Sequence, residues 1–117
     1  MQEWNDTLFK QWLDLQKAFR ANKKNKNWSN VIELCNAIIQ LDSRAKFIRI
    51  MVPLFYKEMA NAYEKIHDIS NSIKFYSFAR DGFMKYRAEE SLASSKDWLS
   101  DIDRINKKLI KLSSKYR

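Results

Sequence analysis

Residues 59–79, which read MANAYEKIHDISNSIKFYSFA, decide the fold class of this chain. Small and apolar residues recur at helical spacing on both sides of the polar pair His67-Asp68. The beginning of the second helical pattern also occurs earlier, because Trp28–Ile32 (WSNVI) lies 41 residues before Ile69–Ile73 (ISNSI). A repeat of this kind is typical of stacked helical hairpins, since one hairpin cannot bury its apolar face alone.

The scarcity of turn residues also predicts an all-α fold. The 117 residues contain one glycine, Gly82, and one proline, Pro53. Sheets and tight β-hairpins need repeated Gly, Pro, Asn-Gly or Asp-Gly pairs, and only Asp81-Gly82 resembles one. A chain of this length is typical of one domain with one core. We therefore predict a single helical domain over residues 1–117.

Apolar periodicity predicts about five to six helices within this domain. The first hairpin, about residues 3–42, holds a helix from Glu3 to Arg20, a polar loop over 21–27, and a helix that begins near Ser29. The last third, about residues 83–115, keeps helical spacing and is interpreted as one or two capping helices.

The second hairpin, about residues 44–80, contains Pro53 within a long apolar pattern. A proline inside a helix costs about 3 kcal/mol, so the pattern from 44 to 67 is either one kinked helix or a helix opened by Pro53. We favour the kinked helix. The following helix should run from Ser70 to Arg80 and end at Asp81-Gly82, where glycine can adopt the left-handed conformation.

The stretch quoted above resembles the tetratricopeptide (TPR) repeat family. The similar positions are a large-small pair, a tyrosine, a turn, a small residue, an aromatic and an alanine: Met59-Ala60, Tyr63, His67-Asp68, Ser72, Tyr76 and Ala79. The period is about seven residues longer than the roughly 34 usual in that family. The resemblance implies a short right-handed solenoid of stacked hairpins with a C-terminal capping helix.

Members of that family generally bind peptides or proteins, so the resemblance implies a non-catalytic interaction module or adaptor. A concave face lined by the third helix would then hold a peptide or helix of a partner protein through Lys57, Asn61 and Glu64. One subclass grips acidic chaperone tails through Lys, Arg and Asn. Here Glu58 stands where that subclass presents an Asn, and its carboxylate disfavours such a ligand.

The charge of the chain supports an alternative function. Lys and Arg total 22 and Asp and Glu 14, giving a net charge of +8 that is concentrated at the two ends. The alternative is a nucleic-acid-associated accessory protein that contacts phosphates without sequence specificity. No aromatic ladder interleaves its candidate basic residues, which are Lys23, Lys24, Lys26, Arg104, Lys107, Lys108, Lys111 and Lys115.

Candidate catalytic and metal-binding residues are few. Glu64 and His67 have the Glu-x-x-His spacing of some metal sites, but such sites need a second pair and His67 is the single histidine. The single cysteine, Cys35, lies among apolar residues and is interpreted as a buried thiol. We therefore predict no enzyme activity, no cofactor and no metal.

Location and self-association are also predicted. Residues 1–6 are acidic where a signal peptide would be basic, and no apolar run reaches the roughly 18 residues of a membrane span. These features, with one cysteine, predict a cytoplasmic protein. The apolar stretch Phe47–Tyr56 suggests a further hypothesis of a homodimer.

Overall fold

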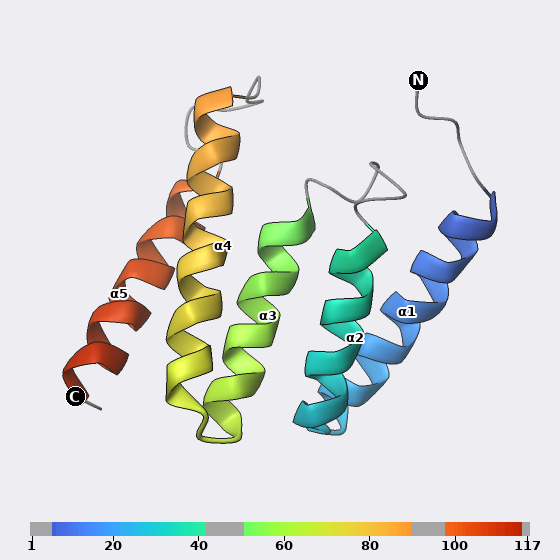
Figure 1. Ribbon diagram of the computed structural model, residues 1–117, viewed down its shortest axis with the longest axis horizontal. Helices are drawn as coiled ribbons and strands as arrows, with labels where there is room; N and C mark the ends of the chain where they lie inside the picture. Colours follow the sequence, from blue (N-terminus) through green and yellow to red (C-terminus); the bar gives the residue numbers. More distant parts are fainter. Residues whose placement is uncertain (1–5, 42–50, 90–97, 116–117) are drawn as a thin grey trace.

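The protein is an all-α domain of five helices in the computed structural model, which describes residues 6–41, 51–89 and 98–115. The helices are α1 (Asp6–Lys24), α2 (Trp28–Gln40), α3 (Val52–Lys65), α4 (Ile69–Glu89) and α5 (Leu99–Lys115). No strand occurs within these ranges. Figure 1 shows the helices side by side in chain order, with α3 in the middle and α1 and α5 at the two ends. The predicted all-α hairpin arrangement is confirmed.

The two hairpins are closed by the same backbone turn. After α1, the Asn27 N–H donates to the Asn22 carbonyl at 2.9 Å and the Lys26 N–H to the Lys23 carbonyl at 3.1 Å. After α3, Asp68 and His67 make the equivalent bonds to Tyr63 and Glu64 at 2.9 and 3.0 Å. This pair of bonds is the Schellman motif, which requires a left-handed residue. Lys26 (φ 59°) and His67 (φ 66°) supply it, and they lie 41 residues apart.

Positions related by the 41-residue repeat are buried in both hairpins. Val31, Cys35 and Ile38 on α2 are at most 1% exposed. Their counterparts on α4 are Ser72, Tyr76 and Ala79, which are at most 5% exposed. The repeat seen in the sequence is therefore also a repeat of inward-facing positions.

Helix α3 is the centre of the domain because it contributes to two cores. Phe55, Met59 and Ala62 pack in a first core with α1 and α2, where Phe19 and Phe55 meet edge to face at 5.4 Å. Ala60 packs in a second core with α4 and α5. In this second core Phe83 is fully buried and stacks on Trp98 at 5.0 Å.

Pro53 opens α3, so the favoured kinked helix is not what the structure shows. Helix α3 begins at Val52, and Pro53 occupies its first turn, where the missing N–H needs no partner in the helix. The structure agrees with the part of the alternative that it describes, a helix opened by Pro53. The start of the predicted pattern, residues 44–50, lies outside the described residues, as do the first residues predicted for the N-terminal helix.

Two predicted helix ends were wrong. Helix α4 continues through Gly82 to Glu89, because Gly82 serves as a contact point rather than a helix end. A Cβ at Gly82 would lie 2.7 Å from Pro53 Cγ, so only glycine allows α3 and α4 to approach this closely. Helix α1 likewise extends to Lys24 and absorbs half of the predicted loop.

The outer helix α5 covers the second core as the predicted cap. Ile105 and Leu112 are 2% exposed and face that core. None of the helices within the described ranges is both long and apolar enough to cross a membrane.

Candidate functional site

A groove of about 250 Å³, lined mostly by residues with polar side chains, runs along α3 between α1 and α5. It brings together side chains from four helices that are far apart in the sequence. Its lining residues are Lys23 of α1, Lys57, Glu58 and Asn61 of α3, Tyr76 of α4, and Arg104, Ile105 and Lys108 of α5.

The spacing of residues on each helix explains why these side chains face the groove. Lys57 and Asn61 are four residues apart on α3, so they lie one above the other on one face. Arg104 and Lys108 have the same spacing on α5. Core residues occupy other faces of the two helices, Phe55, Met59 and Ala62 on α3 and Ile105, Leu109 and Leu112 on α5, and the polar stripes remain at the groove.

Three ion pairs join the helices that form the groove. Lys23 Nζ lies 2.9 Å from Glu58 Oε1, and Lys57 Nζ lies 3.4 Å from Asp101 Oδ1. Lys108 Nζ lies 3.2 Å from Glu64 Oε1. The six side chains are between 23% and 44% exposed, so water and salt screen the pairs and each stabilises the fold only modestly. Their larger effect is to neutralise the negative charge of all three carboxylates, Glu58, Asp101 and Glu64.

Tyr76 forms the floor of the groove with a neutral hydroxyl. The Tyr76 Oη–H donates to Glu64 Oε1 over a long distance of 3.5 Å. Burial raises the pKa of Tyr76 well above its ordinary value of 10.0, and the nearby charge of Glu64 raises it further. Tyr76 therefore remains a hydrogen-bond donor throughout the physiological pH range.

Two polar side chains in the groove make no hydrogen bond or ion pair with another described residue. Among the residues that the structure describes, neither the Asn61 amide nor the Arg104 guanidinium has a hydrogen-bond or ion-pair partner. Arg104 is exposed, whereas Asn61 is half-buried between its neighbours. An amide both donates and accepts, and a guanidinium donates in a planar fork, so both are suited to peptide groups and carboxylates.

The residues predicted to bind a partner lie together. Lys57 and Asn61 line the groove, and Glu64 sits beside them, held by Lys108 and Tyr76. Glu58, which was expected to repel acidic ligands, is paired with Lys23.

The residues predicted as a basic surface divide into two groups. Lys23, Arg104 and Lys108 line the groove, although the sequence suggested an outer strip for them. Lys107 pairs with Asp103 on the outside of α5 at 3.2 Å, and Lys24, Lys26 and Lys111 are exposed. The Lys115 side chain lies outside the described residues.

Sequence reasoning missed Tyr76, Asp101 and Ile105, and it placed Arg104 and Lys108 on a separate surface. The sequence did contain a signal that the α5 residues should line the groove. In a hairpin stack the first helix of each unit shares one face, so the helix that follows the second hairpin should line the same groove as α3.

The single histidine and the single cysteine lie outside the groove. His67 is exposed in the α3–α4 turn, while Glu64 faces Lys108 and Tyr76. Cys35 is fully buried, and this burial raises the pKa of its thiol to about 12. Within the described residues, no three His, Cys, Asp or Glu side chains are grouped so that they could hold a metal ion.

Comparison of the chain with family models, with curated proteins and with solved structures gives no match. The contacts within the groove are therefore the basis for the functional proposal.

Proposed function

We propose that this chain is a helical-repeat interaction module of the TPR type, which binds a peptide or helix of another protein in the groove. The observation that carries the proposal is the pairing pattern on the groove wall. Every carboxylate there is compensated, while Asn61 and Arg104 remain uncommitted. The half-buried Asn61 amide and the exposed Arg104 guanidinium can therefore bond to the peptide groups and carboxylates of a ligand without breaking a contact of the fold.

The chemistry of the groove favours a protein ligand over nucleic acid. Lys23, Lys107 and Lys108 are each held by a carboxylate, so they are less free to release counterions from a phosphate backbone. Glu58, Glu64 and Asp101 would also lie close to any phosphate placed in the groove. The exposed Lys24, Lys26 and Lys111 keep non-specific nucleic-acid binding as the second candidate function.

A site-specific crosslinking experiment tests the first function. A photo-reactive amino acid at position 61 should capture a defined partner in cells, and the same probe at Glu33, exposed on α2, should not. Asn61→Ala and Lys57→Ala should each reduce co-purification of that partner. Equal capture from both positions, or variants that leave co-purification unchanged, would reject the groove as the binding site.

The second candidate function makes a different prediction. Binding to duplex or single-stranded nucleic acid should be detectable near 50 mM salt and fall steeply as salt rises. The triple variant Lys24→Ala/Lys26→Ala/Lys111→Ala should then lose affinity, while Asn61→Ala should not. Binding that is undetectable at low salt removes this candidate.

A further inference from the structure

Two ion pairs join α3 and α5 along the groove in the same register. Lys57 Nζ lies 3.4 Å from Asp101 Oδ1, and Lys108 Nζ lies 3.2 Å from Glu64 Oε1. In both pairs the α5 residue follows the α3 residue by 44 positions, and the two helices run in the same direction (Figure 1). The pairs are seven residues apart on each helix, which is about 10 Å along its axis. We call these two ion pairs the cross-helix pairs.

Asn61 and Arg104 lie between the cross-helix pairs. Asn61 stands between the two paired residues of α3, and Arg104 stands between the two paired residues of α5. Both side chains line the groove, and neither makes a hydrogen bond or ion pair with another described residue. At this level α3 therefore offers an amide and α5 offers a guanidinium, with no carboxylate joining them.

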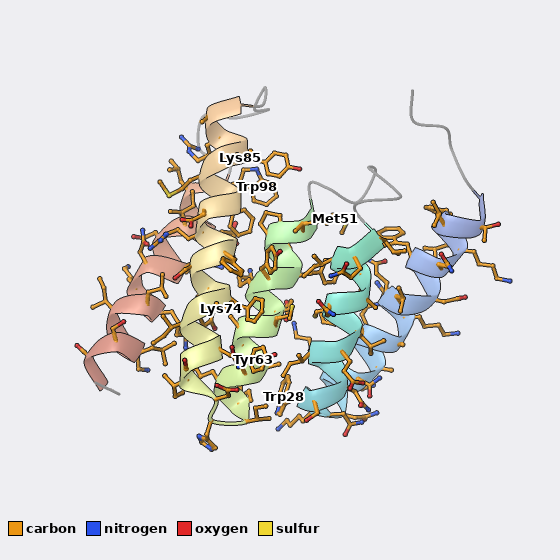
Figure 2. All side chains as sticks on the ribbon, viewed as in Figure 1. Trp28, Met51, Tyr63, Lys74, Lys85 and Trp98 are labelled. Atoms are coloured by element: carbon orange, nitrogen blue, oxygen red, sulfur yellow. The ribbon has the colours of Figure 1, made fainter. Side chains whose placement is uncertain are left out.

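The Asn61 side chain points to the far side of the view in Figure 2. Tyr63 on α3 lies on the face turned to the reader. Tyr63 follows Asn61 by two residues, which is about 200° around a helix, so the two side chains point in nearly opposite directions. Arg104 is exposed and Asn61 is half-buried. A ligand that enters the groove from the far side thus meets the guanidinium first and the amide deeper.

The charges of the groove leave one positive charge unbalanced. Among the described residues, the groove is lined by four cations, and each of its three lysines pairs with one carboxylate. The net charge of this set is therefore +1, and the unbalanced charge is that of Arg104. A guanidinium can donate two parallel hydrogen bonds to one carboxylate, and the amide of an asparagine can donate another. One carboxylate between Arg104 and Asn61 would make the groove neutral.

We infer that the groove binds a partner peptide through one acidic side chain, whose carboxylate lies between Asn61 and Arg104. This inference rests on the peptide-binding function proposed above and names the ligand group that the groove recognises. The cross-helix pairs occupy the levels on either side, so the main chain of the peptide lies outside them and a side chain reaches the half-buried amide. Arg104 selects the negative charge, and Asn61 orients the carboxylate.

Two other anionic groups fit this position less well. A phosphate carries nearly two negative charges at neutral pH, and the carboxylates of Asp101 and Glu64 lie on either side of it. A C-terminal carboxylate is attached directly to the main chain, so the last residue itself would have to enter between the cross-helix pairs. Glu58 does not occupy the position, because Lys23 of α1 holds it at 2.9 Å.

Short peptides followed by NMR provide a direct test. The full chain is isotope-labelled, and the signals observed are those of the Asn61 side-chain amide and the Arg104 Nε–H. The probe is an acetylated and amidated pentapeptide with Glu at its centre and Ala elsewhere, and the control peptide has Gln at its centre. We expect the Glu peptide to shift both signals with a Kd in the low millimolar range, and the Gln peptide to bind at least about tenfold more weakly.

Variants of the protein test the two roles. Arg104→Gln should bring the affinities for the Glu and Gln peptides to within about twofold of each other, and Arg104→Glu should favour a peptide with Lys at its centre. Asn61→Ala should weaken binding of the Glu peptide by about fivefold. Lys107→Gln removes one positive charge on the outside of α5 and should leave the preference for Glu unchanged. Circular dichroism of every variant checks that its helices remain intact.

Several results would overturn the inference. Equal affinity for the Glu and Gln peptides would do so, as would the absence of saturable shifts at about 20 mM peptide. A phosphoserine peptide that binds at least about tenfold more tightly than the Glu peptide would identify phosphate as the ligand group. A Gln peptide with a free C-terminus that binds as tightly as the Glu peptide would identify a chain end. The proposed function fails separately, when the photo-reactive probe at position 61 captures no partner.

Discussion

In the α1–α2 hairpin the helices meet around Phe19, Val31 and Cys35, whereas the same three repeat positions of the α3–α4 hairpin hold Ala60, Ser72 and Tyr76. The Ser72 hydroxyl donates a hydrogen bond to the Ala60 carbonyl at 2.8 Å. This contact is possible because both residues are small. The first hairpin is instead filled by apolar side chains around an identical turn. Equivalent positions can therefore be packed by side chains of different size.

The difference in size affects the groove. Tyr76 is long enough to reach Glu64 and form the groove floor, whereas Cys35 at the equivalent position ends within the first core. Most residues that line the groove thus belong to the second hairpin and to α5, which packs against it.

The largest expected effect comes from giving the first hairpin the side-chain size of the second. Ile38 is 1% exposed and corresponds to Ala79, so Ile38→Ala leaves a cavity in the first core. We expect a loss of about 3 kcal/mol in the free energy of unfolding, measured by urea denaturation. The reciprocal Ala79→Ile should cost about 2 kcal/mol through overpacking. A loss below about 1 kcal/mol for Ile38→Ala would show that the first core can collapse around the gap.

The second effect concerns Cys35 and Tyr76, equivalent buried groups whose pKa values are both raised. Folding raises the pKa of the Cys35 thiol from 9.0 to about 12. The neutral thiol therefore contributes its full stability below pH 9, and this contribution is lost as the pH rises toward 12. Between pH 8 and 10.5 the free energy of unfolding should fall by about 2 kcal/mol from Cys35. Cys35→Ala should reduce this fall by that amount in denaturation at both pH values. An unchanged pH dependence would contradict the assignment.

The third effect concerns the helix N-caps, Asn27 and Asp68, at the starts of α2 and α4. Asp68 Oδ1 accepts a hydrogen bond from the Asn71 N–H at 3.2 Å at the start of α4, whereas Asn27 makes no such bond at the start of α2. Asp68→Ala should therefore cost about 1 kcal/mol in thermal or urea unfolding. Asn27→Ala is the matched control and should change stability by less than about 0.5 kcal/mol. Equal losses would mean that the caps do not distinguish the hairpins.

The smallest effect should be the same in both hairpins. Lys26 and His67 hold left-handed conformations that L-residues adopt with strain, and glycine relieves it at some cost in unfolded-chain entropy. Lys26→Gly and His67→Gly should each raise the free energy of unfolding by about 0.5 kcal/mol. Lys17→Gly, at an exposed position in the middle of α1, should instead lower it by about 1 kcal/mol. Opposite signs at Lys26 and His67 would show that the two turns are not energetically equivalent.

Much of the fold could be predicted because its signals are local. The 41-residue repeat, the turn at His67-Asp68 and the inward positions Ser72, Tyr76 and Ala79 all follow from spacing along one or two helices. The ends of α1 and α4 could not be predicted in this way. Gly82 usually indicates a helix end, and only its contact with Pro53, 29 residues earlier, explains why the helix continues.

By itself the sequence determined the helices, their pairing into hairpins and the stripe that carries Lys57, Asn61 and Glu64, because these depend on contacts within a few residues. Only the tertiary structure decided the groove. The three ion pairs of the groove join residues 35 or 44 positions apart. Such pairs are set by how α1 and α5 pack around α3, and periodicity within one helix contains no information about that packing.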